Sequence, residues 1–95
     1  MLTLAAMKAF ALGRRAKWKD YVDLYFIIRD YYSIAEIATQ AQEIFGHLFS
    51  EKLFREQLAF HQDIDYSEPL EYLIPPVPEI EIKNFLIKKA TNLFD

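Results

Sequence analysis

Lys8, Asp20 and Asp23 are the residues near the start of the chain whose types and spacing suit polar chemistry. Lys8 is the only charged side chain among the first 13 residues, and the two aspartates follow a basic turn. Residues three apart are neighbours on the surface of a helix, so the two carboxylates would lie close together. Residues 1–19 carry five cationic side chains and no acid, although the net charge of the chain is −3. Such a locally positive end attracts anions, and anion binding is the chemistry that this stretch favours.

Each of these residues also has a plainer structural interpretation. Lys8 lies in an apolar helix, where it either extends its ammonium group into water or stays half buried beside an anionic partner. We favour the first interpretation because buried charges are rare. Asp20 in the first turn of a helix would complement the helix dipole, and Asp23 would pair with Lys19 one turn away. The basic residues between the two helices would then form an ordinary solvated turn.

Composition limits the class of protein. The 95 residues are 53% hydrophobic and 16% aromatic, which suits one globular domain with a dense core. The chain has no cysteine, which excludes a disulfide framework and a thiolate metal site. No uncharged stretch approaches the roughly 18 apolar residues of a membrane span, and the N-terminus lacks the features of a signal peptide. These observations favour a cytoplasmic protein with no membrane partner.

Helices are the elements that must position the polar side chains. Apolar residues repeat at helical spacing over residues 3–12 and 17–31, which predicts two helices. Thr3 is the expected N-cap of the first helix, and Gly13 is expected to end it in a left-handed conformation. Apolar residues of the second helix cover more than one face, so we expect it to be central and buried on two sides.

Capping residues predict where the next two helices begin. Ser33 and Glu36 have the spacing of a capping box, in which each side chain bonds the main-chain N–H of the other. The third helix should start there and end near Gly46. Ser50 is the expected cap of a fourth helix that reaches about residue 62. The buried stripe of that helix is expected to comprise Leu53, Phe54, Gln57, Leu58 and His61.

The chain between residues 63 and 78 contains all four prolines. It should be extended and lie across the bundle, since proline and the residue before it avoid the helix interior. Its apolar anchors are expected to be Leu70, Tyr72, Leu73, Ile74 and Val77. A last helix is expected over residues 79–94. The sequence therefore predicts an all-α fold, in which residues 1–95 form one domain. That domain is a compact bundle of about five helices with an extended proline-rich segment before the last one.

The lysine, the basic turn and the aspartate pair together resemble a known family. A lysine in an alanine-rich helix, then an arginine, then a basic residue followed by Asp-x-x-Asp-Leu is similar to the second half of the AbiEii-type nucleotidyltransferase toxins. The segments that carry this resemblance are Ala6-Met7-Lys8, Ala11-Leu12, Arg14-Arg15, Lys17-Trp18-Lys19-Asp20 and Asp23-Leu24-Tyr25. The resemblance is specific over residues 4–25. It continues more weakly through residues 60–63, the proline-bearing connector and the last helix, and so covers most of the chain.

The resemblance implies roles for five residues. Lys8 would contact the phosphates of a nucleotide, and Asp20 would be the supporting carboxylate of the active site. Asp23 would be a structural or secondary acid. Arg14 or Arg15 would order the turn or bind phosphate. These roles agree with the physics of nucleotidyl transfer. A cation held in advance on a water-excluded surface of the active site stabilises the negative charge that develops on the transferred group.

Members of this family also carry a glycine-led strand with an Asp-x-Asp pair that binds metal ions, and the sequence has no such strand. Asp63-Ile64-Asp65 has the same spelling, but it follows a helix and lies after Lys8, so we expect a turn that exposes its carboxylates. We expect the triplet of His61, Asp63 and Asp65 to hold no metal, because hard cations need more oxygen ligands. Without carboxylates that bind a pair of metal ions, the chain is not expected to catalyse two-metal phosphoryl transfer.

The expected function is that of a partial nucleotidyltransferase-like domain, similar to the C-terminal helical portion of such an enzyme and inactive on its own. No cofactor is expected in this chain alone, since Mg²⁺ and a nucleoside triphosphate would serve only a complete enzyme. The expected partners are a separate metal-binding half or a cognate antitoxin. The alternative is a small helical protein–protein interaction domain with no catalytic role, which forms a homodimer through apolar surface left exposed.

The sequence contains no motif for direct nucleic-acid binding. Trp18 beside the basic turn could stack on a base, but a tryptophan at the start of an apolar helix is more typical of a core residue. Four tyrosines of the second helix and the turn after it are likewise expected to serve mainly in packing: Tyr21, Tyr25, Tyr31 and Tyr32.

Overall fold

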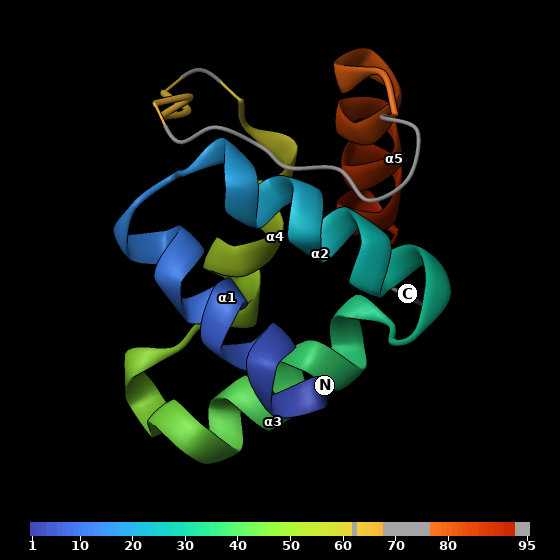
Figure 1. The fold of residues 1–95 in the computed structure, drawn as a ribbon. Coiled ribbons are helices and arrows are strands. Elements are labelled where there is room, and N and C mark those ends of the chain that lie inside the picture. Colours follow the sequence, from blue (N-terminus) through green and yellow to red (C-terminus); the bar gives the residue numbers. More distant parts are fainter. Residues whose placement is uncertain (62, 68–76, 93–95) are drawn as a thin grey trace.

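The computed structural model describes residues 1–61, 63–67 and 77–92. Within these residues the chain forms five α-helices and one short 3₁₀ helix (Figure 1). In chain order they are α1 (Leu2–Arg14), α2 (Trp18–Asp30), α3 (Ile34–Phe45), η1 (Gly46–Leu48), α4 (Glu51–Ala59) and α5 (Glu79–Thr91). The described part of the chain has no β-strand and a single parallel bridge, between Lys17 and Asp65. The predicted all-α fold is confirmed.

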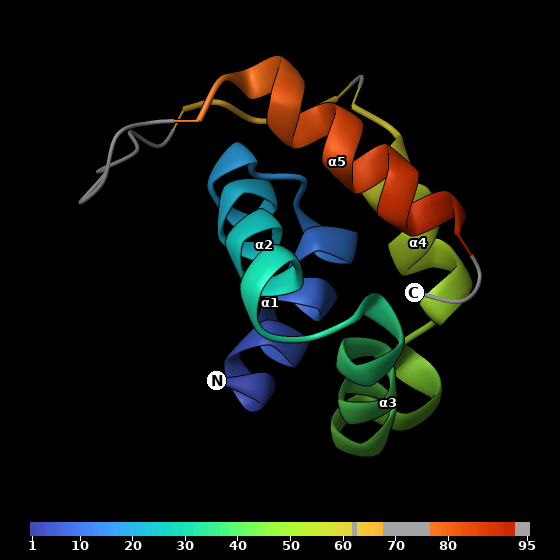
Figure 2. The ribbon, with the colours of Figure 1, turned by 90° about the vertical axis from the view of Figure 1, so that its right-hand side faces the viewer.

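Helix α1 packs against α2, α3 and α4. Its buried side chains at Ala5, Ala6 and Ala9 are small, which allows neighbouring helices to approach closely. Helix α5 packs against α2 and α4, on the side of the bundle away from α3 (Figure 2). No described helix is long and apolar enough to cross a membrane.

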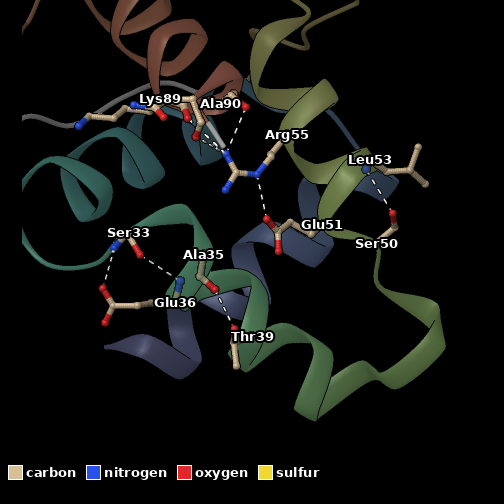
Figure 3. A network of polar contacts seen from close by, with 11 residues as sticks. Ser33, Ala35, Glu36, Thr39, Ser50, Glu51, Leu53, Arg55, Lys89 and Ala90 are labelled. Atoms are coloured by element: carbon tan, nitrogen blue, oxygen red, sulfur yellow. Dashed lines mark hydrogen bonds and ion pairs between the residues drawn. The ribbon is translucent and has the colours of Figure 1, made fainter. Parts of the chain in front are cut away.

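Caps set the starts of α3 and α4 as predicted. The Glu36 main-chain N–H donates to Ser33 Oγ at 3.1 Å, and the Ser33 N–H donates to Glu36 Oε1 at 3.1 Å, which completes the capping box (Figure 3). Ser50 Oγ accepts from the Leu53 N–H at 3.3 Å. Gly46 ends α3 with φ of 59° and ψ of −133°, a conformation that favours glycine because a Cβ would be strained there.

The predicted ends of α1 are wrong. The helix begins at Leu2, and its N-cap position has no side-chain hydrogen bond, so Thr3 lies inside the first turn and is not the cap. Gly13 does not stop the helix. Its φ is not positive, and the helical hydrogen bonds continue until Arg15, whose backbone is extended. Because Gly13 does not adopt a positive φ, the helical hydrogen bonds continue past it to the Arg15 N–H.

Helix α2 lies within the predicted range and buries a wide face. Trp18, Tyr21 and Tyr25 are buried, which confirms the prediction that they serve in packing. Tyr31 is 63% exposed, so the same prediction is wrong for that residue. The reason is that α2 ends one residue earlier, and the backbone of Tyr31 departs from helical angles.

Helices α4 and α5 are shorter than predicted, because α4 ends at Ala59 and α5 at Thr91. The stripe predicted for α4 is partly wrong: Leu53 is 63% exposed, whereas Arg55 is only 8% exposed. Val77 packs against the core as expected. The other anchors predicted for the proline-rich segment lie outside the described residues, namely Leu70, Tyr72, Leu73 and Ile74.

Candidate functional site

Helices α1 and α2 bring Lys8, Asp20 and Asp23 together. Lys8 Nζ lies 2.7 Å from Asp23 Oδ2 and 3.5 Å from Asp20 Oδ1. The exposed fractions of the three side chains are 21%, 18% and 37% in the order Lys8, Asp20 and Asp23. The ammonium group therefore does not extend into water, and the interpretation that we favoured from the sequence is wrong. The alternative, a half-buried lysine with anionic partners, is what the structure contains.

The two carboxylates keep Lys8 charged. Burial lowers the pKa of Lys8, but the hydrogen bond and charge of Asp23, with a smaller contribution from Asp20, outweigh it and raise the pKa above its usual value. Asp23 therefore pairs with Lys8 on the neighbouring helix, and not with Lys19 on its own helix as the plainer interpretation had it. A lysine ammonium has three N–H donors, so two carboxylate partners leave one donor for a further anion.

A basic pocket adjoins this ion cluster. It has a volume of about 350 Å³, and Ala11, Arg14, Arg15, Lys17 and Asp20 line it. Arg14 and Arg15 are exposed. Asp20 belongs to both the pocket and the ion cluster, so the two features form one continuous surface. The pocket lining contains two exposed arginines and one carboxylate, Asp20, so it suits an anionic ligand.

A distant segment of the chain holds the basic turn in place. The Asp65 N–H donates to the Ala16 carbonyl at 2.7 Å, and the Trp18 N–H donates to the Asp65 carbonyl at 2.9 Å. The Asp65 side chain accepts from the Ser67 N–H at 2.8 Å. These hydrogen bonds from Ser67, and more weakly the charge of Lys17, lower the pKa of the Asp65 carboxyl. The main chain on either side of Lys17 is thus tied to residues almost fifty positions later.

Aromatic and cationic side chains reinforce this tie. The rings of Trp18 and Tyr66 lie 5.7 Å apart. Lys83 Nζ, on α5, lies 5.7 Å from the centre of each ring and 3.2 Å from Glu79 Oε2. Trp18 is therefore part of this packed cluster, as predicted, and does not present its face for base stacking.

The segment of Asp63 and Asp65 forms the expected turn, in which both residues are exposed. His61 Nε2 lies 2.7 Å from the Leu58 carbonyl oxygen. Among the described residues there is no group of three or more His, Asp or Glu side chains placed to hold a metal ion. The donor set of this part of the chain does not fit a metal pair.

Sequence reasoning selected five of the residues that the structure brings to this surface but missed two others. Lys17 lines the pocket, and Asp65 supports the turn through its main chain. The charge of Lys17 was a usable signal, because it lies in the same basic run as Arg14 and Arg15. Asp65 stood out in the sequence only as part of an Asp-x-Asp pattern, and no pattern indicates its role in the turn, since that contribution comes from backbone atoms.

A protein-family model described as "Nucleotidyl transferase AbiEii toxin, Type IV TA system" matches residues 2–92. The match includes the ion cluster, the basic turn and the later helices. No curated protein and no solved structure matches the chain.

Proposed function

The chain belongs to the AbiEii nucleotidyl transferase toxin family, and on this premise we propose that α1 and α2 supply the phosphate-contacting wall of a nucleotidyltransferase-like site. The observation that carries the proposal is the position of Lys8, whose ammonium is held by Asp20 and Asp23 beside a pocket lined by Arg14 and Arg15. The wall would bind the phosphates of a nucleoside triphosphate.

Lys8 is suited to this role because it is oriented before a ligand arrives. Phosphoryl transfer gains most from cations placed in advance where negative charge develops. Asp23 at 2.7 Å and Asp20 at 3.5 Å fix the ammonium at the contact between the two helices. The lysine therefore does not have to lose side-chain freedom when phosphate binds, and its remaining N–H is available to a phosphate oxygen.

The neighbouring side chains divide the remaining tasks. Asp20 would be the supporting carboxylate, since it touches both Lys8 and the pocket. Asp23 would be the secondary acid that positions the ammonium. Arg14 and Arg15 carry planar guanidinium groups, which bind phosphate through paired N–H donors. The exposed position of both arginines leaves them accessible to the outer phosphates of a nucleotide.

These 95 residues would bind nucleotide without transferring it. The family chemistry calls for carboxylates that hold Mg²⁺ at the reacting phosphate. Asp63 and Asp65 do not form such a set with the other described carboxylates, and the main chain of Asp65 is used to tie down the basic turn. We infer that another polypeptide segment supplies the metal-binding carboxylates. Because the family is a toxin of a toxin–antitoxin system, a cognate antitoxin is a second proposed partner.

Calorimetric titration with ATP and GTP tests this function. Replacing Lys8 with methionine removes a charge-assisted hydrogen bond of about 1.5–3 kcal/mol, so affinity should fall by about 10- to 100-fold. Replacing the exposed Arg15 with glutamine should also weaken binding, without disturbing the core. Lys88→Met on α5 is the matched control and should leave affinity unchanged. The proposal is wrong if the unmodified protein binds neither nucleotide, or if Lys8→Met binds as tightly as the unmodified protein.

A second candidate function is a helical interaction domain with no catalytic role. It is favoured by three exposed apolar side chains spaced three residues apart, Met1 at the N-cap of α1 and Leu4 and Met7 within that helix, which are 58%, 50% and 53% exposed. Apolar residues gathered in this way mark interaction surfaces more often than isolated ones do. A null result in the nucleotide titrations, together with partner binding that Leu4→Ser abolishes, would favour this function over the first.

A further inference from the structure

A groove that shares only Arg14 with the basic pocket carries an inference that does not depend on nucleotide binding. It lies between the C-terminal half of α1, η1 and α4, and its volume is about 610 Å³. Lys8, Asp20 and Asp23 do not line it. Three apolar side chains of its lining protrude into solvent: Leu48 is 68% exposed, Leu53 is 63% exposed and Phe60 is 65% exposed. Figure 3 shows Leu53 pointing away from the buried Arg55 on the same helix.

We propose that a second copy of this chain occupies the groove and that the two copies are related by a twofold axis. The charges of the two walls support this occupant. Arg14 on α1 and Glu56 on α4 both line the groove. In a twofold interface, a residue that contacts a second residue of the other copy has that contact repeated with the roles exchanged. Arg14 of each copy would therefore meet Glu56 of the partner subunit, and the ion pair would form twice.

Both charged groups are available for such a contact. The Arg14 guanidinium lies 5.8 Å from the centre of the Phe10 ring. Neither Arg14 nor Glu56 makes an ion pair with any residue in the described part of the chain. Opposite charges on opposite walls of one groove are what a self-complementary surface requires, whereas a surface of one sign would repel its own copy.

The shape of the surface also favours a protein over a small ligand. Pockets for small molecules enclose their ligand and bury their apolar walls. Here the exposed side chains of Leu48, Leu53 and Phe60 belong to the lining of the groove itself. In a twofold dimer, these apolar side chains of one copy could enter the groove of the other, and the reverse. The α1 wall is open at Gly13, where a Cβ atom would meet no heavy atom within 4 Å. A side chain from another copy can therefore reach the main chain of α1.

Sedimentation equilibrium over a wide range of protein concentrations tests the proposal. We expect a monomer–dimer equilibrium for the unmodified chain. Arg14→Glu and Glu56→Arg should each weaken dimerisation by about tenfold or more, because like charges then face each other. The double variant Arg14→Glu/Glu56→Arg should restore the association, since each pair is re-formed with its charges exchanged. Glu43→Arg, an exposed reversal on α3 outside the groove, should have no effect.

Gly13→Leu provides an independent test of the same surface. The space around Gly13 is open and its φ is not positive, so a leucine fills the groove while the helix is retained. We expect a folded monomer, with the folded state verified by circular dichroism. A chain that stays monomeric at every concentration overturns the proposal. A dimer that survives Gly13→Leu, or a charge exchange that fails to restore association, also overturns it.

Discussion

Replacing Arg55 with methionine should release the C-terminal end of α5 from the bundle. Arg55 Nη1 lies 3.4, 3.2 and 3.0 Å from the carbonyl oxygens of Lys89, Ala90 and Asn92, and Arg55 Nε lies 2.9 Å from Glu51 Oε2 (Figure 3). The last carbonyl groups of a helix have no partner within the helix. A buried guanidinium group on α4 therefore satisfies the end of α5.

The contacts allow the size of the effect to be worked out. A hydrogen bond to a charged group contributes about 1.5–3 kcal/mol, and one Nη1 atom shared among three carbonyls cannot contribute three full bonds. Glu51 is 47% exposed, so its ion pair with Arg55 is worth about 0–1 kcal/mol. The expected loss for Arg55→Met is about 2–4 kcal/mol. For a domain whose total stability is about 5–15 kcal/mol, this loss lowers the melting temperature by about 10–30 °C.

Urea unfolding followed by circular dichroism measures the loss, and hydrogen exchange locates it. Amides in the last turn of α5 should exchange first in Arg55→Met. Glu51→Gln is the matched control and should cost less than about 1 kcal/mol. If Arg55→Met costs less than about 0.5 kcal/mol, or if Glu51→Gln costs as much as Arg55→Met, then the guanidinium group does not cap α5 and the reasoning is refuted.

Two further predictions concern the glycines and Lys8. Gly46→Ala should destabilise the protein by about 1–3 kcal/mol because of the positive φ of 59°. Gly13→Ala should instead stabilise it by about 0.5–1 kcal/mol, since this position is helical and open. If the melting temperatures of the two glycine variants shift in the same direction, these two predictions are contradicted. The pKa of Lys8 is raised in the folded state, so its ion cluster contributes fully below the unfolded lysine pKa of about 10.4 and is lost as the pH rises through the folded value. Unfolding free energy measured in urea should therefore fall more steeply above about pH 10.4 in the unmodified protein than in Lys8→Met, and parallel pH profiles would argue against the ion cluster.

Local patterns were sufficient to predict where α3 and α4 begin. The capping box of Ser33 and Glu36 and the cap at Ser50 each join atoms within one helical turn, so the neighbouring residues contain everything that decides them. The same locality explains the errors on α4. Nothing within one turn indicates that Leu53 is exposed while Arg55 is buried, because the carbonyl groups that draw Arg55 inward belong to α5.

The order of residues was enough to establish an all-helical chain, the family to which it belongs and most of the residues that line the candidate site. It did not establish which atoms meet. Lys8 was expected to reach solvent, and only the packing of α1 on α2 pairs it with carboxylates that are 12 or more residues away. The main chain at Asp65 ties down the basic turn in the same manner. Helix periodicity and capping act over three or four residues, whereas these contacts form only after distant segments have packed, and side-chain chemistry alone does not specify that packing.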